Sequence, residues 1–190
     1  MTKSFESVAQ EHLAAIEKSF QGENLQILDK ISKEILRAFK DGLKLLLCGN
    51  GGSAADAQHI AAEFIARFKR ERRSLPAIAL TTDTSILTAI GNDYGFEDVF
   101  SRQVEGLGNK GDVLIAISTS GNSKNVLKAV DQARRQGMVT VGFTGGTGGS
   151  LGSKVDLCFK AQSVKTPHVQ EVHIAALHAL SEVVEDGLFG

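Results

Sequence analysis

A chain of 190 residues and 20.2 kDa has the length of one folded domain. Its 21 Lys and Arg nearly balance 22 Asp and Glu, and the formal net charge of -1 argues against a general binder of nucleic acid or of anionic membranes. No stretch approaches the roughly 18 apolar residues of a membrane span, whereas 20 glycines, about 1.5 times the usual share, cluster between the predicted elements.

Two amphipathic helices are predicted at the N-terminus, within residues 1–42. Apolar side chains recur there at spacings of three and four, which is the period of a helix with one buried face. Gly42 is a typical C-terminal stop for the second helix. The apolar positions are Phe5, Val8, Ala9, Leu13, Ile16 and Phe20 in the first helix and Leu25, Leu28, Ile31, Ile35 and Phe39 in the second.

Five short apolar runs then alternate with helical patterns. This alternation is typical of βαβ units whose parallel strands are buried on both faces. The last helix follows Thr166 and Pro167, which are predicted as its N-cap and first helical residue. The sequence therefore predicts an α/β fold, a doubly wound five-stranded parallel sheet with two additional N-terminal helices. The predicted strands are 43–48, 77–80, 113–117, 139–143 and 157–160.

No linker, low-complexity stretch or strong internal repeat divides the chain, so residues 1–190 are predicted to form one domain. The helix after the first strand is predicted over 54–69. The charged run at its end, Arg67–Ser74, is interpreted as a solvated helix end and loop.

The two cysteines, Cys48 and Cys158, fall in predicted strands far apart in sequence and lack CxxC spacing. This placement is typical of buried reduced thiols rather than of a disulfide scaffold or a zinc finger. The first twelve residues also lack the apolar core of a signal peptide. Together these features predict a cytoplasmic protein.

The first candidate ligand site is the turn Gly49-Asn50-Gly51-Gly52-Ser53, because ligands of open parallel sheets collect beyond the carboxyl ends of the strands. Glycine lets a ligand approach the backbone, and the helix that follows offers unpaired N–H donors to an anion. Gly49, Gly51 and Ala54 also fit a degenerate dinucleotide fingerprint, but the acidic residue expected about 20 positions later is missing. No nucleotide cofactor is therefore predicted, and a tight turn without ligand is the alternative.

The second candidate turn, after the third strand, is Ser118-Thr119-Ser120-Gly121-Asn122-Ser123. Small hydroxyls and backbone N–H groups at a helix N-terminus suit a phosphate monoester, whereas a dinucleotide pyrophosphate usually meets bare glycines. Capping of the helix by one serine, with turn formation by the rest, is the alternative. The turn favours a phosphorylated small molecule as the ligand.

Two pairs of polar side chains lie on predicted helices. His59 and Glu63 are spaced i, i+4, so they share one helix face and either hold a metal, act as acid and base, or form a polar surface pair. Gln170 and His178 are eight residues apart, roughly 12 Å along a straight helix. A metal shared by those two side chains would need a kink or a second subunit.

A further polar turn, Gly91–Gly95, follows the helix after the second strand. Asn92 and Asp93 in it suit sugar hydroxyls, although Asn-Asp between glycines is also ordinary turn chemistry. The remaining histidines are interpreted as packing residues. These are His12, His168 and His173.

Four motifs, taken in order, resemble the sugar isomerase (SIS) domain family and, within it, the phosphoheptose isomerases. They are GNGGSAADAQHIAAEF, AIGNDYGFEDVFSRQVEGL, GDVLIAISTSGNSKNVLKAV and HVQEVHIAALH. The resemblance implies a homotetramer in which residues 1–42 pack the subunits together and the active sites form between subunits. It also implies interconversion of sedoheptulose 7-phosphate and D-glycero-D-manno-heptose 7-phosphate, the first step toward activated heptose for lipopolysaccharide and other surface polysaccharides.

The same resemblance implies a role for each matching residue. The acid/base pair corresponds to Glu63 and His178, and one zinc ion per subunit corresponds to the ligands His59, Glu63, Gln170 and His178. The substrate-binding residues correspond to Asn50, Gly51, Gly52, Ser53, Glu63, Asn92, Asp93, Ser118, Thr119, Ser120, Ser123 and Gln170.

The implied chemistry moves a proton between C1 and C2 of the sugar through an enediolate, which needs a base, an acid and stabilisation of negative charge. Glu63 and His178 supply the first two as a pair whose order the sequence leaves open, and zinc would polarise the carbonyl. One alternative is a non-catalytic SIS-domain regulator that binds a phosphosugar or a protein, such as a replication initiator-associating protein; that family lacks the acid/base pair. The other is an isomerase of a different phosphosugar.

Overall fold

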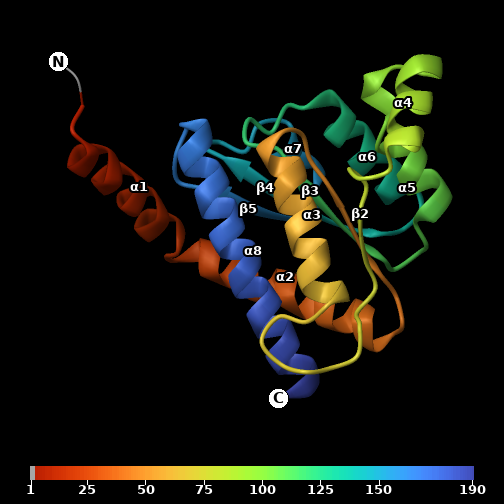
Figure 1. Cartoon of the computed structure of the whole chain (residues 1–190), viewed down its shortest axis with the longest axis horizontal. Helices are drawn as coiled ribbons and strands as arrows, with labels where there is room; N and C mark the ends of the chain where they lie inside the picture. Colours follow the sequence, from red (N-terminus) through yellow and green to blue (C-terminus); the bar gives the residue numbers. More distant parts are fainter. Residues whose placement is uncertain (1–2) are drawn as a thin grey trace.

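The computed structural model describes residues 3–190 and contains a five-stranded, all-parallel sheet between two layers of helices (Figure 1). The strand order is β2-β1-β3-β4-β5, which is doubly wound, and it confirms the predicted fold class. The strands are β1 Leu45–Cys48, β2 Ala77–Ala79, β3 Val113–Ile117, β4 Val139–Gly145 and β5 Leu157–Ala161.

Each face of the sheet has its own apolar core, because successive side chains of a strand point to opposite faces. Leu45 and Leu47 of β1 lie in one core, and Leu46 and Cys48 lie in the other. The first core is covered by α1 Phe5–Ser19, α2 Glu23–Lys40, α3 Gly52–Ile65 and α8 Thr166–Phe189. The second is covered by α4 Thr84–Asp93, the 3-10 turn η1 Phe96–Asp98, α5 Ser101–Leu107, α6 Lys124–Arg135 and α7 Leu151–Lys154.

Several predicted boundaries, strand ends among them, are wrong by a few residues. The helix predicted over 54–69 begins at Gly52 and ends at Ile65. The last helix begins at Thr166, so that Lys165 is its N-cap and no side chain caps it. Asn92 and Asp93 form the last turn of α4 rather than a separate turn, because the helix continues past Gly91.

The charged run Arg67–Ser74 is not a solvated loop throughout, which corrects the prediction. The Arg72 side chain is only 1% exposed and is paired with Glu185 of α8, whose side chain is 2% exposed. The pairing supplies the opposite charge that makes burial of an arginine tolerable.

Both cysteines are unpaired thiols, with Cys48 buried and Cys158 half-buried. Burial raises the pKa of the Cys48 thiol to about 12. No helix among residues 3–190 is both long and apolar enough to cross a membrane.

His173 is a buried histidine of the first core. Its Nε2 lies 2.9 Å from the carbonyl oxygen of Thr144, and its ring packs edge-on against Phe143. Burial lowers the pKa of His173 to about 4, and the bond to Thr144 opposes this shift only in part. The ring is therefore neutral at pH 7, with Nε2 donating to the carbonyl.

Because the pKa of His173 is lowered, we expect the protein to lose stability in mild acid. The unfolded state takes up its proton near pH 6.5 and the folded state only near pH 4, so the stability is fully present above pH 6.5 and is lost as the pH falls toward 4. The loss should reach about 3 kcal/mol in free energy of unfolding. His173→Gln keeps a donor for Thr144 without titrating, so its urea-unfolding free energy should change less over this range.

The variant must be compared with the unmodified chain, because Asp56 changes the stability with pH in the direction opposite to His173. Burial raises the pKa of Asp56 to about 6, so its contribution is lost as the pH rises from 3.8 to 6. Equal acid dependence in the variant and the unmodified chain would contradict the assignment to His173.

Candidate active site

The candidate site lies at the carboxyl ends of the adjacent central strands β1 and β3, which pair in register from Leu45 opposite Val113 to Cys48 opposite Ala116. Their following helices, α3 and α6, cover opposite faces of the sheet. Such a switch point opens a crevice between the two loops, where ligands of doubly wound sheets bind.

The backbone of the loop after β1 requires glycine at positions 49 and 51, and a third glycine, Gly52, is packed against a side chain. Gly51 has φ +55 and ψ -122, a conformation that other residues rarely adopt. A Cβ on Gly49 would lie 2.7 Å from the Ser53 carbonyl oxygen, and one on Gly52 would lie 2.0 Å from Nε2 of Gln170. No side chain caps α3, and the backbone N–H groups of Ser53, Ala54 and Ala55 donate instead to the carbonyl oxygens of Asn50 and Gly51.

A reciprocal pair of side-chain amides joins the two loops of the crevice. Asn50 donates to Asn125 at 2.9 Å, and Asn125 donates to Asn50 at 2.8 Å. Asn125 lies in the first turn of α6 and is 4% exposed. Asn125 was not predicted as a site residue. The sequence signal that could have found it is a polar residue at a helix position that the helical period predicts to be buried.

The loop after β3 gathers the predicted hydroxyls at the start of α6. The Ser118 and Ser123 hydroxyls lie 2.9 Å apart. Ser123 occupies the N-cap position but makes no capping bond, so the simple capping alternative is not what this side chain does. Gly121 has φ +67, and a Cβ there would lie 2.0 Å from the Gly148 carbonyl oxygen, so the loop is locked against residues 148–149.

Helices α3 and α8 bring together His59, Glu63 and His178. His59 Nε2 lies 2.8 Å from His178 Nε2 and 3.3 Å from a Glu63 carboxylate oxygen. One ligand atom from each of the three lies within 4.8 Å of the other two. Ligand atoms on one tetrahedral zinc lie roughly 3.3 Å apart, so two imidazoles and a carboxylate at this spacing fit the metal.

The other predicted polar residues lie away from this cluster. Gln170 contacts Gly52, two turns before His178 along α8. Asn92 and Asp93 are exposed, and the Asn92 amide donates to Asp93 at 2.8 Å. Within residues 3–190, no hydrogen bond joins either of them to the other predicted site residues.

Two neighbours of the site were missed from the sequence. Asp56 lies on α3 one turn before His59, and its Oδ2 is buried without a hydrogen-bond partner among the described residues. A cleft of about 140 Å³ beside Asn50 is lined by Leu87 of α4 and Phe96 of η1. No sequence signal marked these positions, because Asp56 is an isolated aspartate and the apolar residues that line the cleft are scattered along the chain.

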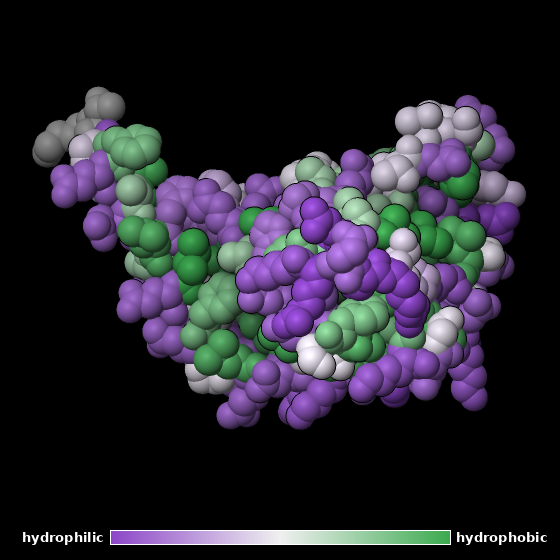
Figure 2. All heavy atoms as spheres, turned by 60° about the horizontal axis from the view of Figure 1, so that its bottom comes forward, coloured by the Kyte–Doolittle hydropathy of each residue, from purple (hydrophilic) through white to green (hydrophobic). Residues whose placement is uncertain are grey.

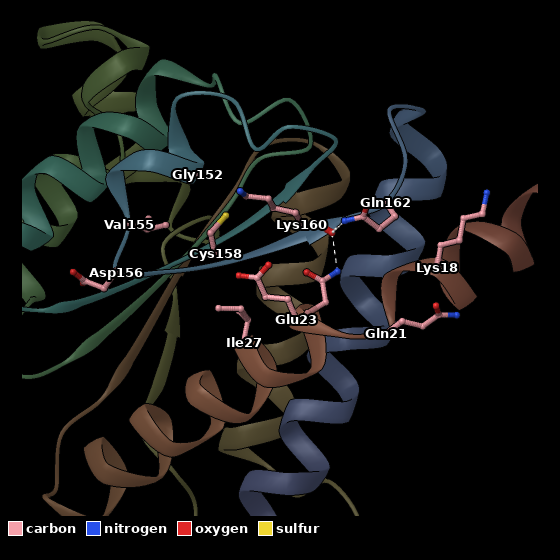
Figure 3. A pocket seen from close by; sticks show the side chains of 11 residues that line it. Lys18, Gln21, Glu23, Ile27, Gly152, Val155, Asp156, Cys158, Lys160 and Gln162 are labelled. Atoms are coloured by element: carbon pink, nitrogen blue, oxygen red, sulfur yellow. Dashed lines mark hydrogen bonds between the residues drawn. The ribbon is translucent and has the colours of Figure 1, made fainter.

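A larger cavity of about 610 Å³ lies elsewhere, between α2, α7 and the outer edge of β5 (Figure 3). Its charged lining includes Lys18, Glu23, Asp156 and Lys160. No predicted site residue lines it, so it is separate from the crevice between β1 and β3.

Comparisons with known proteins point to one family. The SIS domain family model matches residues 9–145. A phosphoheptose isomerase of Roseiflexus sp. (strain RS-1) is 62% identical over 159 residues, which are 84% of this chain and 81% of that protein.

Two solved structures are similar over almost the whole chain. The phosphoheptose isomerase of Neisseria gonorrhoeae has a TM-score of 0.86 and 40% identity, covering 96% of this chain and all of that one. The phosphoheptose isomerase of Francisella tularensis has a TM-score of 0.89 and 34% identity, covering 97% of this chain and all of that one.

Proposed function

Because the chain belongs to the phosphoheptose isomerases of the SIS domain family, we propose that it interconverts sedoheptulose 7-phosphate and D-glycero-D-manno-heptose 7-phosphate. The observation that carries this proposal is the meeting of a carboxylate and two imidazoles between α3 and α8, in a chain so similar to named isomerases. The reaction would serve the biosynthesis of activated heptose for surface polysaccharide.

The phosphate of the sugar is assigned to the loop after β3. The loop offers the hydroxyls of Thr119 and Ser120 together with Ser118 and Ser123, next to the uncapped N–H groups of α6. A helix N-terminus with small hydroxyl donors favours a doubly charged monoester. The sugar chain then runs along the loop Asn50–Ser53 toward α3.

The proton transfer is assigned to Glu63 and His178. One group removes a proton from C1 or C2, while the other protonates or polarises the neighbouring oxygen, and the reverse transfer completes the exchange. Their shared neighbour His59 brings a carboxylate and an imidazole to the same point from two helices. Asn92 and Asp93 are proposed to bind sugar hydroxyls, in one subunit or across a subunit contact.

His59, Glu63 and His178 are proposed to hold one zinc ion per subunit. Gln170 lies two turns before His178 on α8, so it is proposed as the fourth ligand only from a neighbouring subunit. When bound, zinc would act as a Lewis acid on the substrate oxygen and stabilise negative charge. A side chain that binds a metal is a weaker base than a free one, and this holds for Glu63 and His178 alike, so the proton transfer is assigned to the pair and not to one of them.

A homotetramer is also proposed, with sites completed between subunits. The N-terminal helix α1 projects from the body of the molecule, and apolar side chains are exposed along it (Figures 1 and 2). Phe5 is 90% exposed and Leu13 is 59% exposed, although both belong to the apolar positions of a predicted amphipathic helix. A nearby apolar groove of about 300 Å³ between α2 and α8 includes Leu25 and Val183. Light scattering on the full chain would test the mass.

A cytoplasmic location is proposed with the same reaction. The unpaired thiols of Cys48 and Cys158 support it, because disulfides are rare and thiols persist in reducing compartments.

The experiment is turnover of sedoheptulose 7-phosphate by the metal-stripped chain, before and after addition of zinc. We expect turnover to fall on stripping and to return with zinc, with magnesium as the control, since Mg²⁺ disfavours nitrogen ligands. Full activity without metal would remove zinc from the proposal. Inactivity with every heptose and pentose phosphate would favour the non-catalytic binding protein.

A further inference from the structure

The segment between α3 and β2 makes contacts that the proposed reaction does not explain. Residues 67–72, called the strap below, carry five charged side chains and are not part of any helix or strand. A sequence of this kind is expected in solvent. Instead, the strap lies along the C-terminal half of α8, where one carboxylate organises it.

The Glu185 carboxylate accepts four hydrogen bonds from the strap. The donors are the backbone N–H groups of Phe68 at 3.0 Å, Lys69 at 2.7 Å and Arg70 at 3.0 Å, and Nε of Arg72 at 2.7 Å. Three successive backbone donors on one buried anion fix the path of the chain as well as its position.

Arg72 extends the connection to the helix that carries Glu63. Its Nη2 donates to the Glu63 carbonyl oxygen at 2.8 Å, and its Nη1 donates to the Phe64 carbonyl oxygen at 2.9 Å. These carbonyls belong to the last turn of α3. Carbonyl groups there have no N–H donor within the helix. One guanidinium therefore ties the end of α3 to α8, the helix that carries His178.

Phe68 lies against the imidazole of His178. The two rings are stacked, with centroids 6.0 Å apart and planes inclined by 27°. On another side, the His59 ring meets His178 edge-on, with centroids 5.0 Å apart and planes inclined by 84°. The His178 ring is thus bounded by an aromatic face and by a hydrogen-bonding neighbour.

We propose that Phe68 is a positioning residue that fixes the ring of His178 for proton transfer, and that Glu185 holds Phe68 in place through the strap. This inference rests on the proposed role of Glu63 and His178. A partly exposed imidazole has several open rotamers, and proton transfer needs one orientation of its reacting nitrogen. The flat Phe68 ring excludes the rotamers that would swing His178 toward it.

The test replaces the ring while keeping an apolar side chain. Phe68→Leu and Phe68→Met should lower kcat about 10- to 100-fold, since small misplacements of reacting groups cost up to about that much, while KM for sedoheptulose 7-phosphate changes less than about twofold. Phe68→Tyr keeps the aromatic face and should restore kcat. The matched control is Glu71→Gln, on the same strap. Among residues 3–190 the single ion pair of Glu71 is a 3.8 Å contact to Arg67, so this variant should leave kcat unchanged.

A second readout does not depend on turnover. In the full chain with ¹³C-labelled histidine, the ring protons of His178 should show the ring-current shift of a stacked phenyl group and nuclear Overhauser contacts to Phe68. Both should vanish in Phe68→Leu and Phe68→Met, with broadening of the His178 signals by rotamer exchange. An unmodified chain without isomerase activity would end the proposed function, whereas these spectra would still report the stacking.

Three results would overturn the inference. One is a kcat in both Phe68→Leu and Phe68→Met that equals that of the unmodified chain. Another is an unchanged His178 spectrum in a folded variant. A rise in KM with constant kcat would likewise contradict it, because that pattern belongs to a residue that binds substrate.

Discussion

Glu63→Gln and His178→Ala are each expected to lower kcat for sedoheptulose 7-phosphate by at least about 10³-fold while the fold is retained. Glu63→Gln keeps the shape of the side chain and removes the carboxylate that meets His59 at 3.3 Å. His178→Ala removes the imidazole whose Nε2 lies 2.8 Å from His59 Nε2. Neither side chain is part of an apolar core, so circular dichroism and the mass in solution should be unchanged.

The matched control for this pair is Glu182→Gln. Glu182 lies one turn after His178 on the same helix and pairs with Lys69 at the surface. Its replacement should leave kcat within about twofold of the value for the unmodified chain, because exposed ion pairs contribute little to stability. Near-normal turnover in Glu63→Gln or His178→Ala would remove that residue from the proton transfer.

The largest loss of stability is expected for Glu185→Leu. This substitution leaves the buried Arg72 guanidinium and three backbone N–H groups without their acceptor. Removal of one partner of a buried ion pair typically costs about 3–5 kcal/mol in free energy of unfolding. Urea unfolding at fixed protein concentration would measure the change.

Two exposed pairs on the same strap serve as controls. Lys69–Glu182 and Arg70–Asp186 join the strap to α8 in the same way, but their side chains are about half exposed. Lys69→Ala and Arg70→Ala should therefore cost less than about 1 kcal/mol. If Glu185→Leu lowers the free energy of unfolding no more than Lys69→Ala and Arg70→Ala do, the buried carboxylate does not hold the strap.

Glu185 also carries an acid dependence. Its burial by itself raises the pKa, but the three backbone N–H donors and the Arg72 guanidinium outweigh that effect and lower the pKa to about 2. The stabilisation is thus fully present above pH 4.5 and is lost as the pH falls from 4.5 toward 2. This part of the acid unfolding should be absent in Glu185→Leu, and most of it lies below the pH range assigned to His173.

The sequence by itself determined the sheet and its loops. Apolar runs such as 113–117, which are too short for a helix and bounded by turn residues, are local patterns typical of a buried strand, and observed β3 has the same bounds as predicted. The glycines of 49–52 likewise marked a close approach, which the contact between Gly52 and Gln170 explains. Their backbone requirements are local, so a single sequence reveals them.

The tertiary structure alone decided which polar residues meet. His59 and His178 are 119 positions apart, Asn50 and Asn125 are 75 apart, and the strap meets Glu185 across 113 to 117 positions. Local spacing places a residue on a helix face but does not say what that face meets. From sequence, a charged run such as 67–72 is therefore predicted to lie in solvent, because the buried carboxylate that pairs with it comes from a helix at the far end of the chain.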